Sequence, residues 1–332
     1  MPATEDQGAP GPIPPGTRDV LPSELKELRR IEDAFLGEFE QSGYLEVRTP
    51  TIEYASLLEM GGRRGGPLYR FLDDRGELVA LRNDMTVPVS RLAAARLGET
   101  EPPWRLGYLG SSFRTTSPRR ADLREFGQAG VELIGSEGPG GTAEVLAVLD
   151  RCLTGVGVSG AVIAVGDATL WPGLLGEAGA DAGQVGASLD ALAAGDLVGL
   201  EGILRQADGI SAPDDLVALA RTRGGTEVLE ALAGRPERSA GEAAERLDGL
   251  EAALGGSGIA ASLVFDLGMA RDPGYYTGEV FEVYAGGLGR SLGGGGRYDG
   301  LMGQLGAAMP AAGFSVVIER IHEALINAGA SG

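Results

Sequence analysis

Apolar side chains near the start of the chain recur every three or four positions, which is the spacing of one face of an α-helix. These positions are Leu25, Leu28, Ile31, Phe35 and Phe39. Ser23 suits the N-cap of this helix, Glu24 suits its first turn, and Gly43 suits its end. The pattern therefore predicts an amphipathic helix between Ser23 and Gly43.

Shorter apolar runs on either side of the chain's middle predict β-strands. The predicted strands lie at residues 44–50, 68–72, 77–82, 104–114, 124–134, 161–165, 263–265 and 313–318, with a further hairpin after Tyr275. The second and third of these strands form a predicted hairpin across residues 73–76. Helices are predicted at residues 86–97 and 142–153, and a last helix follows the final strand.

The middle of the chain is rich in Ala, Leu, Gly and acidic residues and has several short amphipathic patterns without a strand pattern. Strands at both ends of a chain with helices between them imply one mostly antiparallel sheet interrupted by a helical insertion. We therefore predict an α+β fold in which helices flank the sheet. The expected parts are a flexible N-terminus at 1–16, a discontinuous sheet domain at 17–166 and 259–330, and a helical insertion domain at 167–258.

The composition is that of an ordinary globular protein. Of the 332 residues, 43% are hydrophobic and 23% are charged, and the length suits about two domains. No stretch is long and apolar enough to span a bilayer, and the Pro/Gly-rich start lacks the apolar core of a signal peptide. We expect no membrane association and a cytoplasmic location.

Three residue types that often carry chemistry occur only once each: Cys152, His322 and Lys26. One cysteine excludes an internal disulfide and a thiolate cluster, and one histidine excludes a multi-histidine zinc site. The lysine does not belong to a P-loop motif. We therefore expect no metal and no cofactor.

The formal net charge is −19. Nucleic-acid binding depends on neutralising phosphates with basic side chains, so a strongly acidic chain is disfavoured as a partner of tRNA. We expect no tRNA binding.

One segment towards the C-terminus combines phenols, a guanidinium and glycines. It runs from Arg271 to Glu282 and is followed by the glycine run 293–296 and by Arg-Tyr-Asp-Gly at 297–300. A tyrosine can donate and accept hydrogen bonds, an arginine fork fits a carboxylate, and glycines allow close approach of a ligand or strand. Val280 and Val283 alternate with two glutamates as in a half-buried strand. The segment is either part of a small polar pocket or a hairpin with a glycine-rich turn.

Several motifs in order resemble those of class II aminoacyl-tRNA synthetases. The helix–strand–Pro50 unit resembles motif 1, Phe113-Arg114 with Arg124-Glu125-Phe126 resembles motif 2, and Gly313-Phe314 through Glu319-Arg320 resembles motif 3. Between the last two, the 271–282 segment is similar to the histidine-recognition motif of histidyl-tRNA synthetases and their paralogues. The resemblance implies a class II synthetase-like fold and, through motif 1, a homodimer.

The resemblance also implies a histidine-binding set. Its members here are Asp84, Thr86, Arg114, Gln128, Glu132, Arg271, Tyr275 and Tyr276. By analogy Thr86 and Gln128 hold the α-amino group, Glu132 and Tyr276 read the imidazole, and Arg271 meets the carboxylate. Asp84 stands where the synthetases usually have Glu, Met85 replaces a glycine, and Pro273 restricts the residue before it.

The ATP side of the resemblance is altered. Arg114, Arg124 and Arg320 match the synthetases' cationic clamp, but Thr116, Ser117 and Asp122 stand where those enzymes place Glu and Arg in the motif 2 loop. A pair of opposite unit charges about 4 Å apart attracts by roughly 4 kcal/mol at an effective dielectric near 20. An aspartate in place of an arginine turns this attraction to the triphosphate into repulsion, which disfavours ATP binding.

The chain ends at Gly332, one helix after motif 3, without a segment matching an anticodon-binding domain. With the retained histidine set, this is similar to the regulatory subunits of bacterial ATP phosphoribosyltransferase. That resemblance implies a subunit without catalytic residues that assembles with a short-form catalytic subunit for the first step of histidine biosynthesis, with histidine as feedback effector. Two alternatives stay open. One is a truncated histidyl-tRNA synthetase-like enzyme that forms an aminoacyl adenylate, and the other is a scaffold with a vestigial pocket.

Overall fold

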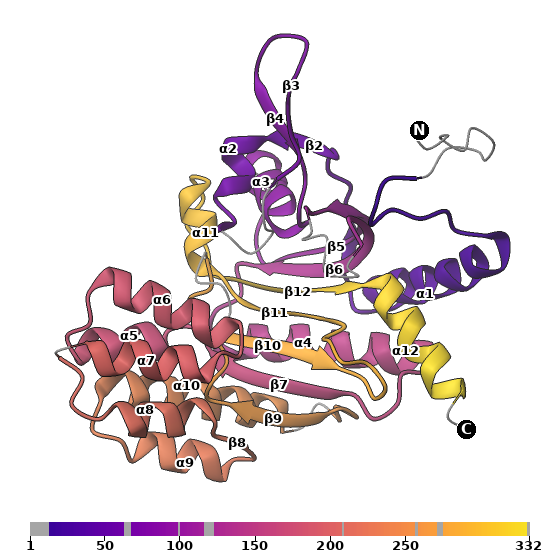
Figure 1. The fold of residues 1–332 in the computed structure, drawn as a ribbon. Coiled ribbons are helices and arrows are strands. Elements are labelled where there is room, and N and C mark those ends of the chain that lie inside the picture. The colour runs from indigo at the N-terminus through magenta and orange to yellow at the C-terminus, as the bar shows by residue number, and fades with distance from the viewer. Residues whose placement is uncertain are drawn as a thin grey trace, which may run out of the picture.

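A nine-stranded sheet forms the centre of the described part of the protein (Figure 1). The computed structural model describes residues 13–62, 68–98, 100–115, 123–207, 209–255, 258–270 and 275–330. The strands are β1 (Leu45–Glu46), β5 (Trp104–Phe113), β6 (Glu125–Ile134), β7 (Val162–Asp167), β8 (Arg223–Gly224), β9 (Ser262–Asp266), β10 (Glu279–Tyr284), β11 (Gly293–Arg297) and β12 (Ala311–Val317). Their order is β1-β5-β6-β12-β11-β10-β7-β9-β8. Only the β1–β5 and β7–β9 pairs among them are parallel, so the predicted mostly antiparallel α+β fold is confirmed.

A three-stranded sheet projects from this centre (Figure 1). It consists of β2 (Ile52–Tyr54), β4 (Leu78–Leu81) and β3 (Arg70–Leu72), beside α2 (Ala55–Glu59). The Asp73 carboxylate accepts the backbone N–H groups of Arg75 and Glu77, and Gly76 has a φ of 80°. These features make the predicted hairpin turn.

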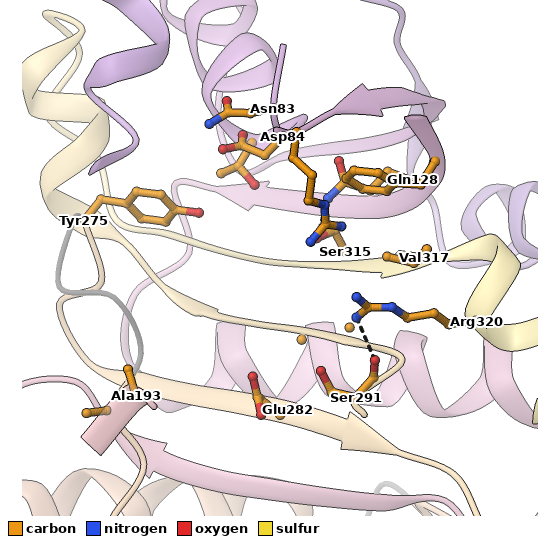
Figure 2. Close-up of a pocket in the computed structure, with 16 residues that line it drawn as sticks. Asn83, Asp84, Gln128, Ala193, Tyr275, Glu282, Ser291, Ser315, Val317 and Arg320 are labelled. Carbon is orange, nitrogen blue, oxygen red and sulfur yellow. Dashed lines mark hydrogen bonds between the residues drawn. The ribbon is translucent and has the colours of Figure 1, made fainter. Parts of the chain in front are cut away.

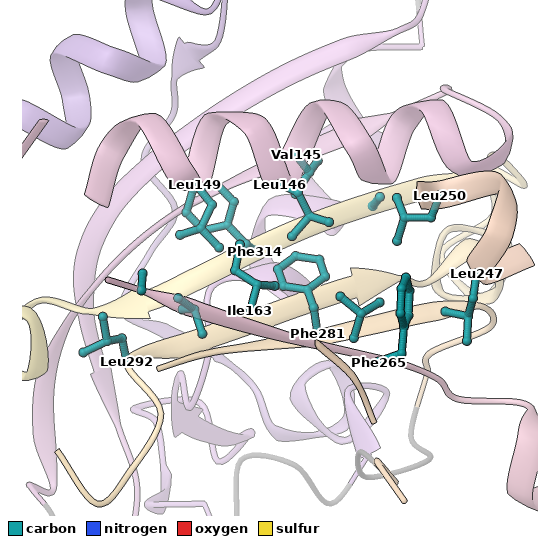
Figure 3. Close-up of a cluster of buried hydrophobic side chains, with 14 of the residues drawn as sticks. Val145, Leu146, Leu149, Ile163, Leu247, Leu250, Phe265, Phe281, Leu292 and Phe314 are labelled. Carbon is teal, nitrogen blue, oxygen red and sulfur yellow. The ribbon is translucent and has the colours of Figure 1, made fainter. Parts of the chain in front are cut away.

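Helices cover both faces of the large sheet. They are α1 (Pro22–Gln41), α3 (Thr86–Arg96), α4 (Gly138–Val156), α11 (Asp299–Gln304) and α12 (Ile318–Ala330). The apolar face of α1 packs with α4 and one side of the sheet, whereas the side chains at the start of α3 pack with those of α11 on the other side. Figure 3 shows the first of these cores, where Leu146 of α4 lies near Phe281 of β10 and Phe314 of β12.

Six helices separate β7 from β9. They are α5 (Leu170–Glu177), α6 (Ala182–Ala193), α7 (Leu197–Gln206), α8 (Pro213–Ala220), α9 (Glu227–Ala233) and α10 (Arg238–Leu254). The sequence predicted no strand here, but β8 pairs antiparallel with β9 and Arg223 Nε lies 2.8 Å from Asp266 Oδ2. A two-residue strand held by an ion pair has no apolar alternation to reveal it. We refer to residues 170–254 as the helical segment.

The predicted ends of two N-terminal elements were wrong. Helix α1 begins at Pro22, whose fixed φ suits the first turn, and no side chain caps it because the N-cap residue Leu21 has no hydrogen-bond acceptor. Ser23 therefore lies inside the helix, and Leu25 is 40% exposed although the other four apolar positions are buried. The predicted strand 44–50 shortens to β1 because the carbonyls of Thr49 and Pro50 accept from the Arg82 guanidinium.

Candidate ligand-binding site

A cavity of about 270 Å³ lies over the middle strands of the sheet (Figure 2). Strands β6, β10, β11 and β12 form its floor, and the start of α3 and the last residue of α6 contribute to its walls. The cavity is large enough for an amino acid and has carboxylate, amide, hydroxyl and guanidinium groups around it.

Five of the eight predicted site residues line this cavity: Asp84, Thr86, Arg114, Gln128 and Tyr275. They come from segments far apart in the chain, which the sheet order brings together. The predicted residue Arg271 and the motif 2 loop positions Thr116, Ser117 and Asp122 lie outside the described residues. Glu132 and Tyr276 are described but lie beneath the lining.

Glu132 on β6 is only 1% exposed, and hydroxyl groups surround it. The Tyr108 hydroxyl lies 3.2 Å from Glu132 Oε1, the Tyr298 hydroxyl donates to Glu132 Oε2, and the Thr86 side chain is near enough to favour the charged carboxylate. Burial raises the pKa of Glu132 to about 8, against the opposing effect of these hydrogen bonds. Thr86, which lies near this carboxyl group, lines the cavity.

Two tyrosines were missed as partners of Glu132. Tyr108 lies on β5 and has no motif around it, whereas Tyr298 lies in the Arg-Tyr-Asp-Gly run that the sequence analysis singled out. The Tyr298 ring contacts the Tyr275 ring at 5.7 Å between centroids, and Tyr275 and Tyr276 are 4.8 Å apart. The cavity residue Tyr275 is therefore packed against two buried tyrosine rings.

The glycine run forms strand β11 and not a turn, so the hairpin-turn interpretation was wrong for these residues. A Cβ atom on Gly293 would lie 2.1 Å from the Ser315 carbonyl oxygen, and one on Gly295 would lie 1.9 Å from that of Gly313. Gly313 in turn leaves space for Glu132, whose Oε2 would be 1.8 Å from an added Cβ. Glycine is needed here for close approach of neighbouring strands, as the sequence predicted.

Hydrogen bonds hold several polar side chains of the cavity in place. Ser112 Oγ donates to Gln128 Oε1 at 2.6 Å, and Gln128 Nε2 donates to Ser315 Oγ at 3.1 Å. The Val87 N–H donates to Asp84 Oδ1 at 3.1 Å at the start of α3. The Asp84 carboxylate and the Gln128 amide are therefore oriented before a ligand binds.

Two guanidinium groups also line the cavity. The Arg114 guanidinium lies 3.9 Å from the centre of the Phe126 ring, and Arg320 Nη1 donates to the Ser291 carbonyl at 2.9 Å (Figure 2). The third arginine of the predicted clamp, Arg124, does not line the cavity. Within the described residues, no group of three or more His, Cys, Asp or Glu side chains is arranged to hold a metal ion.

The chemistry of the cavity matches a small zwitterion. Acidic groups (Asp84 and Glu282) can balance an ammonium group, and Arg114 and Arg320 can balance a carboxylate. Hydroxyl groups and the buried Glu132 carboxyl group lie to one side, where they could form hydrogen bonds with a polar ring.

A family model described as histidyl-tRNA synthetase matches residues 16–321. A protein of Moorella thermoacetica is 41% identical over 316 residues, which is 93% of this chain and 80% of that protein. A protein of Desulforamulus reducens is 37% identical over 321 residues, which is 95% of this chain and 79% of that protein. Both are named ATP phosphoribosyltransferase regulatory subunit.

Solved structures give the same family relationship. A structure from Bacillus halodurans, described as an ATP phosphoribosyltransferase regulatory subunit/histidyl-tRNA synthetase, matches with a TM-score of 0.85 and 30% identity. The match covers 95% of this chain and 83% of the other. A histidine–tRNA ligase subunit from Alicyclobacillus acidocaldarius matches with a TM-score of 0.82 and 31% identity, over 97% and 99% of the two chains.

Proposed function

The chain belongs to the family of ATP phosphoribosyltransferase regulatory subunits, and from this membership we propose that it is a non-catalytic subunit that senses histidine. Its partner would be a short-form ATP phosphoribosyltransferase catalytic subunit, and the complex would carry out the first step of histidine biosynthesis. The observation that carries the histidine assignment is that five of the eight predicted residues, Thr86 and Gln128 among them, line one cavity.

An imidazole needs one hydrogen-bond donor and one acceptor, because its neutral ring has one N–H and one bare nitrogen. A carboxyl group and nearby phenols can supply both. We assign these two roles to Glu132 and Tyr276, and we assign the α-ammonium group to Asp84, Thr86 and Gln128, which line the cavity. We assign Arg271, together with Arg114, to the carboxylate end.

Feedback would work by linkage between the cavity and the partner's active site. Histidine in the cavity would favour a state of the complex in which the catalytic subunit is less active. A coupling free energy of about 1–3 kcal/mol is sufficient for strong feedback, and the partner must then change histidine affinity by the same factor.

A homodimer through the motif 1 region is part of the proposal. The exposed side chains Leu21, Leu25 and Leu45 support it, because they are 67%, 40% and 72% exposed and lie on α1 or next to it. Burial of such side chains in a dimer is favourable.

We propose that tRNA is not a partner, because a net charge of −19 opposes binding to phosphates. No helix in the described parts of the chain is both long and apolar enough to cross a membrane. A cytoplasmic location, where histidine and the catalytic subunit are made, fits the proposed role.

An adenylate-forming ligase is the second candidate function. The name of the Alicyclobacillus relative and the arginines Arg114 and Arg320 at the cavity favour it. The position of Arg114 opposes it, because the guanidinium covers the face of Phe126 on which an adenine ring could stack.

Calorimetry of the isolated chain with histidine tests the proposal directly. We expect 1:1 binding, and we expect the Glu132→Gln, Tyr276→Phe double variant to raise the Kd by about tenfold or more, equivalent to about 1.4 kcal/mol. Glu53→Gln with Tyr44→Phe is the matched control, because it changes a buried glutamate and a buried tyrosine whose partners, Arg91 and Glu144, do not line the cavity. Equal affinity of wild type and double variant would overturn the pocket assignment.

Two activity assays separate the three candidate functions. Mixing the chain with a short-form catalytic subunit should produce phosphoribosyl-ATP formation that histidine inhibits. Activation without histidine binding would indicate a scaffold with a vestigial pocket. Robust histidine-dependent exchange of pyrophosphate into ATP by the chain alone would instead establish the ligase.

A further inference from the structure

Four charged side chains meet at the base of the helical segment, outside the cavity. Asp167 and Glu279 lie directly opposite each other on the antiparallel strands β7 and β10, and each is 2% exposed. Glu279 belongs to the strand that the sequence predicted to be half-buried, and its side chain lies on a buried face. Like charges in this position repel each other, so each carboxylate needs its own cation. Arg246 faces Asp167, and Arg297 lies 3.6 Å from Glu279.

Arg246 extends from α10 and grips the turn that connects β7 to α5. Its Nε and Nη2 atoms lie 2.7 Å and 3.1 Å from the two oxygens of Asp167, and Nη2 also donates to Thr169 Oγ1 at 2.6 Å. The Thr169 N–H donates to Asp167 Oδ1 at 2.9 Å, which closes the turn. A two-pronged guanidinium contact of this kind fixes the position and the direction of the turn.

The same turn is hydrogen-bonded to the segment that follows Tyr275 and Tyr276. The Ala168 N–H donates to the Gly278 carbonyl at 2.9 Å. One residue earlier, the Thr277 N–H donates to the Arg297 carbonyl at 2.8 Å. The backbone just after Tyr275 and Tyr276 is therefore held between the turn on one side and β11 on the other.

The helical segment also borders the cavity itself. Ala193, the last residue of α6, is one of the lining residues, and Figure 2 shows it near the lower edge of the site. Helix α5 starts directly after the turn at Leu170. A shift of the turn would therefore move the backbone that follows Tyr275 and Tyr276. It would also move the start of α5, which leads into α6 and its last residue Ala193.

We infer that Arg246 is a positioning residue of the ligand cavity. From the helical segment it holds the Asp167–Thr169 turn, and through this turn it holds the Tyr275–Tyr276 wall, so that ligand binding and the position of the helical segment are linked. This inference rests on the proposed binding of histidine, and it names the route by which binding would reach the surface of the helical segment.

The test compares Arg246→Gln and Arg246→Lys with wild type by calorimetry with histidine. We expect Arg246→Gln to raise the Kd by about tenfold, in the range that changes along a coupled network produce. Lysine keeps the charge but loses the fork, so Arg246→Lys should recover part of the affinity. The fold should persist, because Leu247 and Leu250 keep α10 in the apolar core (Figure 3).

Arg235→Gln is the matched control. Arg235 also makes a two-pronged contact, to Glu237, and pairs with Asp215, but all three residues lie inside the helical segment. Its removal should lower the melting temperature without changing the histidine Kd. A twofold or smaller effect of Arg246→Gln on the Kd, or equal effects of the two variants, overturns the inference.

Hydrogen exchange of the wild-type protein gives a readout that does not depend on any variant. Histidine should slow amide exchange in residues 167–172 and at the end of α6, as well as in β6 and β12. Protection limited to β6 and β12 overturns the inference but leaves the proposed function intact. Absence of histidine binding by wild type overturns both.

Discussion

Burial strongly alters the acidity of Glu132, which lies next to the cavity on β6. Its pKa rises to about 8 because burial disfavours the charged carboxylate. In the unfolded chain the same group has a pKa of 4.5. Between these two values the folded protein binds more protons than the unfolded chain, so the free energy of unfolding falls as pH rises.

Glu132→Gln should remove this part of the pH dependence. The variant keeps a hydrogen-bonding side chain of the same shape but cannot ionise, so it should gain stability relative to wild type from about pH 5 to pH 8, reaching a few kcal/mol. Urea unfolding at a series of pH values measures the difference. Parallel curves for the two proteins would contradict the assignment of the raised pKa to Glu132.

At the scale of single residues, part of the site was predictable. Thr86 and Gln128 were found through a motif resemblance, and both line the cavity. Tyr108 and Ser315 were not found, because their roles depend on strand pairing: both lie opposite Gly130 of β6, between Gln128 and Glu132. No local pattern contains such cross-strand neighbours.

The type of most elements followed from the sequence, but their limits did not. The predicted strands at 104–114 and 124–134 differ from β5 and β6 by one residue at an end. Strand β1 is much shorter than predicted because a side chain from another element, Arg82, takes the carbonyls that a strand would have used. Such competition appears only once distant segments meet.

Strand β10 places Phe281 in the apolar core that covers one face of the sheet. Phe281 is fully buried between α4 and neighbouring strands (Figure 3), so Phe281→Ala should cost about 3–5 kcal/mol of unfolding free energy. Phe71→Ala is the matched control, because Phe71 is 40% exposed on β3 and should cost well under half as much. Urea unfolding of both variants checks the comparison, and similar losses would show that the core is not centred on β10.

For the whole molecule, the strand order was beyond the reach of the sequence. Strand β12, the last in the chain, lies between β6 and β11. The helical segment is similarly joined to the rest, since Leu247 and Leu250 of α10 belong to the same apolar core as Phe281. We retain 167–258 as a proposed insertion domain, with α10 as the helix through which it packs on the sheet.

The distribution of exposed apolar side chains points to association between copies. Of the 11 large apolar side chains that are exposed in the described residues, nine lie between Ile13 and Leu78 and only Val198 and Ile326 lie elsewhere. Some of them lie on or beside α1 and β1 and the others lie on the three-stranded sheet, and exposed apolar side chains gathered on such elements often mark a surface that meets a partner. This uneven distribution supports the proposed homodimer.

Leu45→Arg should therefore weaken the dimer. Leu45 is 72% exposed on the edge strand β1, so an arginine there will not disturb the monomer's core, but in a symmetric interface it would place a buried charge in both copies. We expect the dimer dissociation constant to rise by about tenfold or more, measured by analytical ultracentrifugation. Val198→Arg is the matched control, because Val198 is 80% exposed on α7 of the helical segment and should leave the constant unchanged. If only the second variant dissociates the protein, the interface lies on the helical segment and the motif 1 proposal is wrong.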